Sequence, residues 1–366
     1  MHTRPLRCAF VGCSNFSRRY LSAYRDTPGV NVDVCVDVDL ERARLATEIL
    51  RQGHPDKAAH ATDDFRAALA DEIDVVVINT PNDLHREQAV AALERGKHVL
   101  LQKPLAATLA DALEIQAAAN KSSGSAGIYM SYFADPIVHD LRAMARAGWF
   151  GSITQIHARL MHSGGLAWSQ EAVIGNPSWR SSARQTGGGA FIQLAVHYLR
   201  IASWILDDSV ARIFGFANNL HCPGLEGEDT GAAVIEFGHG CLATLNVSWC
   251  ARGEELSVHG TEGSFTYLDN RLVTLRSQHN FQGHVVDYNG PGVQSMECDQ
   301  VPIGDATQPF NQHRRFLEDI RSGRQPMVSI DAGVEDMAVT AAFYESVRNG
   351  RMVEPERYPG LRSRVV

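Results

Sequence analysis

The sequence predicts an α/β protein in two parts: an N-terminal doubly wound parallel sheet, then a C-terminal α+β part with an open, mainly antiparallel sheet. In residues 1–128, short apolar runs alternate with helical patterns, which is the order of a parallel sheet with right-handed crossover helices. From residue 129 the strand patterns alternate apolar and polar residues and are joined by glycine turns, which is typical of a sheet with one covered face. We therefore expect one domain at 1–128 and a second at 129–366.

Size and composition indicate a globular protein and exclude several classes of partner. The chain has 366 residues, 44% of them hydrophobic, and a net charge of −8. Nucleic acids and anionic membranes bind clustered positive charge, so we expect neither as a partner. Because no apolar run approaches membrane-spanning length and the N-terminus lacks a hydrophobic signal core, we expect a cytoplasmic protein.

The cysteines predict reduced, buried thiols. None forms a C-x-x-C pair or a metal-like spacing, and several lie in apolar strand patterns, so we expect no metal site and no disulfide framework. The seven are Cys8, Cys13, Cys35, Cys222, Cys241, Cys250 and Cys298.

The stretch 6–24 reads as a buried strand, a tight turn at Gly12 and a helix capped by a serine or asparagine. Such a unit directs free N–H groups at one point, where a dinucleotide pyrophosphate binds. The usual G-x-G-x-x-G pattern keeps only its first glycine here, with Ser14 and Ser17 at the other two positions. A strand-turn-helix unit of some other α/β protein stays an alternative. The predicted dinucleotide contacts are Gly12, Ser14, Asn15 and Phe16.

Asp37 is the next dinucleotide candidate. It ends a strand predicted at 31–37, 25 positions after Gly12, where a carboxylate accepts hydrogen bonds from the adenosine ribose and repels a 2′-phosphate. This favours NAD over NADP, although Arg42 or Ser14 could hold a 2′-phosphate. The alternative is a turn residue or a cap for the helix that starts at Leu40.

The other expected elements of the first part follow in alternation. Strands are predicted at 74–79, 97–101 and 127–130, and helices at 40–50, 63–69, 83–95 and from Thr108 or Asp111 to about 119.

In the second part we expect a helix at 136–147, a strand at 153–161, a loop to Gln185 and a helix at 190–205. Strands at 210–216, 231–237, 241–249, 255–259, 263–267 and 272–275 and helices at 312–322 and 333–349 follow. The open face of this sheet predicts a homodimer or homotetramer.

Several polar residues could carry chemistry. The Thr80-Pro81-Asn82 turn and Lys103 follow two parallel strands, so both lie on the ligand edge of the sheet. In the second part, Gln193 and His197 lie one helical turn apart after a glycine run. Taken singly, Lys103 could be a solvated loop lysine and His197 a buried core histidine.

Four segments carry a resemblance to a known family: 78–108, with TPNDLH and QKP, 179–206, with WR and GGG, 227–249 and 316–353. Together they resemble the glucose-fructose oxidoreductase, inositol dehydrogenase and rhizopine catabolism (Gfo/Idh/MocA) family. The resemblance implies a Rossmann domain and hydride transfer between a nicotinamide cofactor and a sugar or cyclitol carbinol.

The resemblance also implies roles for individual residues. Thr80, Pro81, Asn82 and His85 would border the nicotinamide ribose, and Trp179 with Arg180 would reach the nicotinamide from the second domain. Lys103 would bond the reacting hydroxyl, and His197 would take or give its proton.

Two positions depart from the family pattern. Gln102 replaces the glutamate before the lysine, and Gln193 replaces the aspartate one turn before the histidine. Since Gln193 can orient His197 but not stabilise its charge, we expect a neutral histidine acceptor beside a cationic Lys103. Tyr132 stands near where the family often has arginine and could line the sugar pocket, or could pack at the domain junction.

Three functions remain open. The first is an NAD-dependent dehydrogenase or reductase for a secondary hydroxyl of a sugar, glycoside or cyclitol. The second is a glycoside-cleaving enzyme that keeps and recycles its NAD through oxidation and elimination. The third is a non-catalytic dinucleotide-binding regulator, which would need neither Lys103 nor His197.

Overall fold

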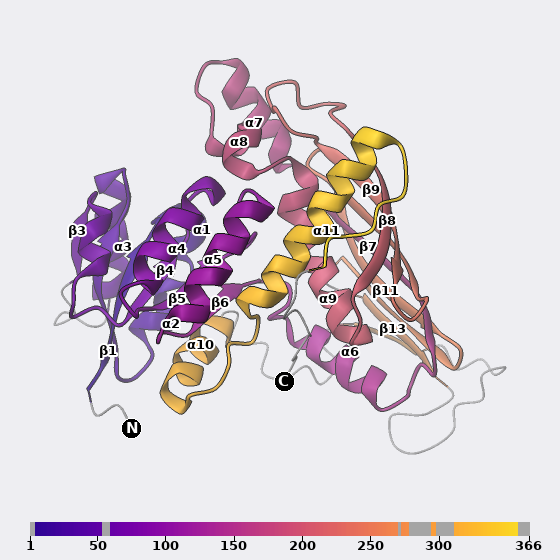
Figure 1. The fold of residues 1–366 in the computed structure, drawn as a ribbon, viewed down its shortest axis with the longest axis horizontal. Coiled ribbons are helices and arrows are strands. Elements are labelled where there is room, and N and C mark those ends of the chain that lie inside the picture. The colour runs from indigo at the N-terminus through magenta and orange to yellow at the C-terminus, as the bar shows by residue number, and fades with distance from the viewer. Residues whose placement is uncertain (1–3, 53–58, 270–271, 278–293, 298–310, 358–366) are drawn as a thin grey trace. The chain divides into compact units, whose positions relative to one another are not determined.

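The computed structural model describes residues 4–52, 59–269, 272–277, 294–297 and 311–357 (Figure 1). Cys298 lies outside this part of the chain. The chain forms two compact units, the first mainly Met1–Ser131 with Gln308–Val334, the second Tyr132–Thr307 with Glu335–Val365. Segment 308–334, which we placed in the second domain, thus folds with the first unit.

The first unit contains a six-stranded parallel sheet in the order β3-β2-β1-β4-β5-β6. Its strands are β1 (Leu6–Val11), β2 (Val30–Val36), β3 (His60–Thr62), β4 (Val75–Ile78), β5 (His98–Gln102) and β6 (Ala126–Tyr129). Strands β1 and β4 are buried almost completely, which explains their continuous apolar runs. The predicted parallel sheet is confirmed, and β3 is an addition too short to leave a pattern.

Helices of the first unit begin and end close to the predicted positions. They are α1 (Asn15–Arg18), α2 (Leu21–Arg25), α3 (Leu40–Arg51), α4 (His85–Leu93), α5 (Leu109–Lys121) and α10 (Asn311–Ser322), with short 3₁₀ turns η1 (Phe65–Leu69) and η2 (Asn82–Leu84). The first predicted helix is two short ones, because Arg19 and Tyr20 donate to carbonyls three residues back. The side chain of Thr108, not Asp111, caps α5.

The core of the first unit lies between its sheet and the helices. Phe10 and Tyr24 pack edge to face at 5.8 Å, and Phe316 and Leu317 of α10 join the same apolar cluster. Helix α10 is therefore part of this core although it is nearly 180 residues from the rest of the unit in sequence.

The second unit contains an eight-stranded sheet in the order β14-β13-β12-β11-β7-β10-β9-β8. Strands β7 and β10 pair in parallel and all other neighbours are antiparallel, so the prediction of an open, mainly antiparallel sheet is confirmed. The strands are β7 (Ile153–Met161), β8 (Val210–Asn218), β9 (Thr230–Phe237), β10 (Leu242–Ser248), β11 (Gly253–Gly260), β12 (Gly263–Leu268), β13 (Leu272–Ser277) and β14 (Gln294–Glu297).

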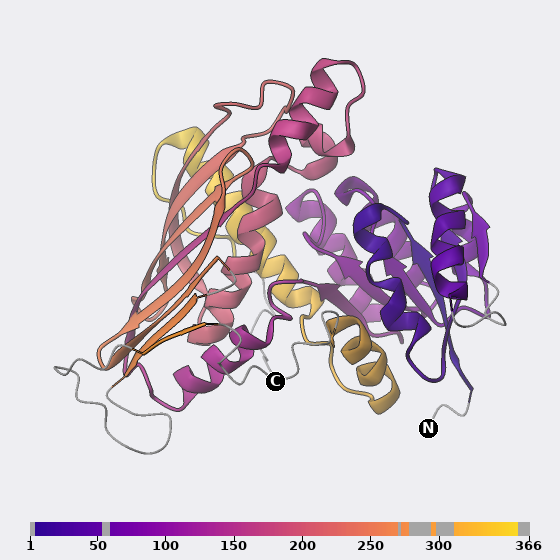
Figure 2. The same ribbon diagram turned by 180° about the vertical axis from the view of Figure 1, so that it is seen from behind.

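Helices cover one face of this sheet (Figures 1 and 2). The helical elements of the unit are α6 (Pro136–Arg146), α7 (Gly164–Val173), η3 (Trp179–Ser181), α8 (Ala183–Thr186), η4 (Phe191–Ala195), α9 (Val196–Leu206) and α11 (Ile330–Asn349), the last beginning in the first unit. Phe343 of α11 stacks on Phe191 at 3.4 Å and lies against Gly215 of β8, which anchors the helix to the sheet.

One prediction for this unit was wrong. The expected loop before Gln185 holds α7, η3 and α8. Glycines at 164 and 165 obscured the start of α7 in the sequence, and Gly165 is required there because a Cβ would lie 2.5 Å from Trp249. The helix expected at 190–205 is confirmed, and it begins with a π-helical turn, η4, a wider turn that often occurs at functional sites.

Among the described residues, one helical stretch, Ala183–Leu206, is long and apolar enough to cross a membrane, contrary to the expectation that no run approaches that length. It comprises α8, η4 and α9, and 94% of its most apolar window is buried inside the structure. Its apolar surface is thus already covered by the protein itself.

Candidate active site

The turn after β1 is built around Gly12. Its φ of +86° is in the left-handed region, and a Cβ would lie 2.6 Å from the carbonyl oxygen of Asn79, so only glycine fits. The Ser17 hydroxyl donates to the Gly12 carbonyl at 2.6 Å, and the Ser17 N–H donates to Ser14 Oγ at 3.4 Å. The two serines that replace glycines therefore stabilise the turn itself.

Asn15 and Phe16 begin α1 beside this turn. Asn15 Oδ1 accepts a hydrogen bond from Arg18, and Phe16, 38% exposed, packs its ring edge to face on Tyr20. The structure thus brings the predicted pyrophosphate residues into one strand-to-helix junction.

Asp37, directly after β2, is bonded to the same junction. Its Oδ2 accepts a 2.7 Å hydrogen bond from the Cys13 N–H, and its Oδ1 accepts one of 3.0 Å from the Asp39 N–H. The residue that caps α3 is Asp39, not Asp37. Each carboxylate oxygen retains a lone pair for a ribose hydroxyl, so the residues present fit a dinucleotide at the carboxyl edge of β1 and β2.

His85 connects the loops that follow β4 and β5. It is fully buried, with Nε2 3.0 Å from the Thr80 carbonyl oxygen and Nδ1 3.1 Å from that of Pro104. Burial lowers the pKa of His85 to about 4, with the charge of Lys103 acting in the same direction. The neutral ring of His85 carries one N–H, so it donates to one of these carbonyl oxygens at a time. Its buried ring lies between the loop carrying Thr80 and the loop carrying Lys103.

Lys103 follows β5 and is half-buried. Its backbone N–H is shared between Gln102 Oε1, at 3.0 Å, and the Tyr129 carbonyl oxygen, at 3.3 Å. The amide that replaces the expected glutamate thus holds the backbone from which the Lys103 side chain extends.

In the second unit, Arg180 lies between two indole rings. Its guanidinium carbon is 4.4 Å from the ring centroid of Trp179 and 5.1 Å from that of Trp168 on α7. Burial lowers the pKa of Arg180 to about 10. The sequence identified the Trp179-Arg180 pair but not Trp168, because α7 was taken for a loop.

The glycine run before η4 fits closely against Glu228 and Tyr344. A Cβ on Gly188 would lie 2.1 Å from the Tyr344 hydroxyl, and one on Gly189 would lie 2.1 Å from the Glu228 carbonyl oxygen. Tyr344 in turn donates to Glu228 Oε1 at 2.8 Å, and so does the Phe191 N–H. The glycine run thus serves packing inside the unit, which fixes the start of the helix carrying His197.

His197 and Gln193 are both buried. Gln193 Nε2 donates to the Thr186 carbonyl oxygen at 3.4 Å. The ring of Tyr132 packs on the His197 ring with 4.8 Å between centroids, so the structure brings these two predicted residues together.

A buried carboxylate beside this cluster was not predicted. The Tyr198 hydroxyl donates to Glu254 Oε1 at 3.0 Å, and Glu254 is 8% exposed. In sequence it is one of two consecutive glutamates in a strand pattern, and nothing there distinguishes it from Glu255.

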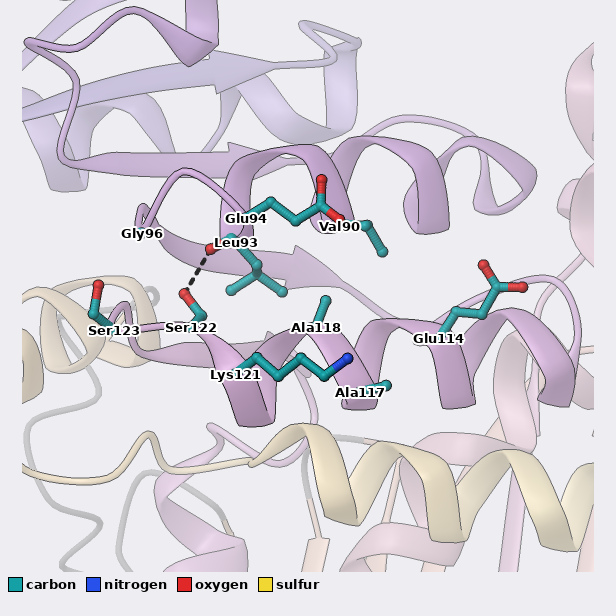
Figure 3. A pocket seen from close by; sticks show the side chains of 10 residues that line it. All are labelled: Val90, Leu93, Glu94, Gly96, Glu114, Ala117, Ala118, Lys121, Ser122 and Ser123. Carbon is teal, nitrogen blue, oxygen red and sulfur yellow. Dashed lines mark hydrogen bonds between the residues drawn. The ribbon is translucent and has the colours of Figure 1, made fainter.

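A hollow of about 560 Å³ lies elsewhere in the first unit, between α4 and α5 (Figure 3). It is lined by Val90, Leu93, Glu94, Gly96, Glu114, Ala117, Ala118, Lys121, Ser122 and Ser123. Several of these residues end α4 and α5, away from the strand ends that carry the predicted site. Within the described ranges no cluster of histidine, cysteine or carboxylate side chains could hold a metal ion.

Comparison with known proteins extends over nearly the whole chain. A model described as "Oxidoreductase family, NAD-binding Rossmann fold" matches residues 6–129, and one described as "Oxidoreductase family, C-terminal alpha/beta domain" matches residues 142–354.

Individual relatives have low sequence identity to this chain, but the matches extend over almost the full length of both chains. A 1,5-anhydro-D-fructose reductase from Ensifer adhaerens is 28% identical over 359 residues, covering 96% of this chain and 98% of the relative. A D-glucoside 3-dehydrogenase from Escherichia coli (strain K12) is 26% identical over 376 residues, covering 97% and 99%. The structure of a levoglucosan dehydrogenase with NADH and levoglucosan has a TM-score of 0.82 at 20% identity, covering 97% of this chain and 100% of that one.

The Gly12 turn, the Asp37 carboxylate beside it and the two family matches lead to the same conclusion. The first unit is an NAD-binding Rossmann domain, and the chain is an oxidoreductase that belongs to the Gfo/Idh/MocA family.

Proposed function

We propose that this protein transfers a hydride between NAD and a secondary hydroxyl or ketone of a sugar, glycoside or cyclitol. The observation that carries the proposal is the position of Lys103. It follows β5, which only β4 separates from β1 and its Gly12 turn, so a cation lies on the same sheet edge as the NAD-binding turn. The relatives named above, which act on an anhydro-sugar and a glucoside, support the substrate class.

The two units have different roles in this proposal. The first holds the dinucleotide through Gly12, Ser14, Asn15, Phe16 and Asp37, with the Thr80-Pro81-Asn82 turn, His85 and Gln102 beside the nicotinamide half. The second binds the sugar through Tyr132, Gln193 and His197, and Trp179 with Arg180 contributes to the nicotinamide side.

Proton transfer is the part of the reaction that the chain's own residues perform. When bound, NAD supplies the hydride acceptor. As the alcohol becomes a carbonyl, the His197 imidazole takes the hydroxyl proton and the Lys103 ammonium stabilises the negative charge on the oxygen. In the reverse direction the protonated imidazole returns its proton to the new hydroxyl.

NADH absorbance tests the proposal directly. Purified protein is mixed with NAD and a panel of methyl glucosides, levoglucosan and scyllo-inositol, and, for reduction, with NADH and 1,5-anhydro-D-fructose. We expect turnover with at least one compound, and a loss of roughly 10²–10⁴-fold in kcat for Lys103→Ala and His197→Ala. Lys121→Ala and His221→Ala, at exposed positions, are the matched controls.

The same assay separates the two other functions. Aglycone release with no net NADH would indicate the enzyme that recycles a tightly bound NAD. NADH binding without turnover on any compound, together with ligand binding unaffected by His197→Ala, would indicate a regulator and overturn the proposal.

Assembly and location are further parts of the proposal. We expect a homodimer or homotetramer formed through the open face of the second sheet. None of the six described cysteines is in a disulfide, which supports the proposed reducing, cytoplasmic compartment.

A further inference from the structure

Glu254 is a carboxylate on the helix-covered side of the second sheet. In β11 it shares its face with Leu256 and Val258, both buried, whereas Glu255 lies on the opposite face and pairs with Arg159 at 3.5 Å. Its backbone is fixed at the end of the strand, since its N–H donates to Asp269 Oδ1 at 2.8 Å and its carbonyl accepts from the Asp269 N–H at 2.9 Å. A buried carboxylate of this kind costs free energy unless hydrogen bonds or an opposite charge compensate for its lost hydration.

The side chain of Glu254 is hydrogen-bonded to one of two tyrosines close to His197. Tyr198, the next residue along α9, donates its hydroxyl to Glu254 at 3.0 Å. Tyr132, whose ring packs on His197, lies 6.2 Å from the Tyr198 ring. Burial and the charge of Glu254 together raise the pKa of Tyr132, so this carboxylate acts electrostatically on the aromatic surroundings of the histidine.

We propose that Glu254 is a positioning residue for His197: its carboxylate holds Tyr198, the next residue on α9, and supplies, at longer range, the negative charge that Gln193 does not provide. This rests on the acid/base role proposed for His197. When His197 takes the alcohol proton it becomes positively charged, and a nearby anion stabilises that state. On this proposal, removing the charge of Glu254 makes the protonated form of His197 less stable.

Two other charged residues on the elements packed around α9, Arg200 and Asp135, have partners of their own. Arg200 on α9 is neutralised by Asp336 at 2.9 Å and Glu335 at 3.0 Å, and Asp135 caps α6 through the Ile137 N–H at 3.1 Å. Arg142 of α6 lies 4.4 Å from the Trp204 ring on α9 and pairs with Asp207 at 3.8 Å. Charged and titratable groups on the described elements around α9 also include Tyr132, Asp135 before α6, His139, Asp140 and Arg146 on α6, His157 and Arg159 on β7, Tyr198 and Arg200 on α9, Glu254 on β11, Tyr267 on β12, and Glu335 and Asp336 on α11. Of these carboxylates, Glu254 is the one hydrogen-bonded to the residue adjacent to His197.

The pKa of His197 is the decisive readout, because it can be measured without a substrate. The protein is labelled with ¹³C-histidine, the His197 signal is assigned by its loss in His197→Gln, and its titration is followed by NMR. Glu254→Gln, which keeps the shape and removes the charge, is expected to lower the His197 pKa by about 0.5–1 unit. Glu255→Gln, on the same strand but the opposite face, should leave it unchanged.

The inference would be overturned if Glu254→Gln shifts the pKa of His197 by less than about 0.2 units. It would also be overturned if Glu255→Gln shifts this pKa by as much as Glu254→Gln does. Should Glu254→Gln not fold, Tyr198→Phe provides the second variant. It removes the hydrogen bond to the carboxylate and should lower the His197 pKa in the same direction by a smaller amount, whereas an unchanged pKa contradicts the proposal.

Kinetics give the second readout once a substrate is known. Alcohol oxidation needs neutral His197, so the acid limb of the kcat profile should move to lower pH in Glu254→Gln, and kcat should fall roughly tenfold with little change in KM. A lower kcat with an unshifted acid limb would indicate a merely structural role. If wild-type protein turns over no sugar while the NMR shift is present, the proposed function fails and the electrostatic coupling stands.

Discussion

The carboxylate of Asp37 accepts a 2.7 Å hydrogen bond from the backbone N–H of Cys13, the residue next to Gly12. The end of β2 is thereby fixed to the turn that follows β1, so the carboxylate that we propose selects the cofactor also holds the turn that we propose binds it. With Gly12 alone left of the three-glycine pattern, this bond and those made by Ser14 and Ser17 stabilise the turn.

Asp37→Asn should raise the dissociation constant for NADH about tenfold or more. It should also reduce the ratio by which the protein binds NADH more tightly than NADPH. An asparagine oxygen can still accept from the Cys13 N–H, so the turn persists, while the charge that attracts ribose hydroxyls and repels a 2′-phosphate is lost. Fluorescence titration with both cofactors measures the change. Asp39→Asn, which keeps the cap of α3, is the control, and an equal loss in both variants would argue against a direct role for Asp37.

His85→Asn should lower the free energy of unfolding at neutral pH, and this decrease should disappear at acidic pH. The folded-state pKa of His85, about 4, lies below its ordinary value of 6.5, so the stability it contributes is present above pH 6.5 and is lost as the pH falls toward 4. The gap in unfolding free energy between wild type and variant should therefore narrow by up to about 3 kcal/mol over this range. Denaturant unfolding at several pH values checks it, with His221→Asn, at an exposed position, as the control.

Gly189→Ala should cost about 3 kcal/mol of unfolding free energy or more, and lower kcat. The new Cβ would lie 2.1 Å from the Glu228 carbonyl oxygen and 2.4 Å from its backbone nitrogen, atoms that cannot rotate away, so the start of the helix that carries His197 must shift. Gly175→Ala is the comparison: its φ of +85° strains alanine by about 1 kcal/mol, but no atom lies within 4 Å. Similar thermal stabilities for the two variants would contradict the packing argument.

The sequence predicted features that depend on neighbouring residues and missed features that are too short or that depend on contacts between distant residues. Strands β1 and β4 were recognisable because burial on both faces leaves an uninterrupted apolar run, whereas β3, three residues long, leaves no pattern. The same holds for the site. Gly12, Asp37 and Lys103 follow strands and could be placed by their neighbours in sequence. Glu254 could not, because what separates it from Glu255 is its contact with Tyr198, 56 positions away.

Val234→Arg should weaken the proposed self-association. On the open face of the sheet, Phe216, Val234 and Leu242 are exposed by 65%, 52% and 48%, and Val234 lies in register between Phe214 of β8 and Thr244 of β10.

We expect a second copy as the partner of this surface, because its apolar centre is flanked by charges of both signs. Arg212 donates to Glu236 at 2.9 Å, and Arg159 pairs with Glu255, so two-fold pairing can set each sign against its opposite. An arginine in the apolar centre would be buried without a partner and should raise the dissociation constant more than tenfold. Sedimentation velocity at micromolar protein measures this, with Val173→Arg on α7 as the exposed apolar control. A monomeric wild type, or equal dissociation by both variants, would mean that the sheet face is not the interface.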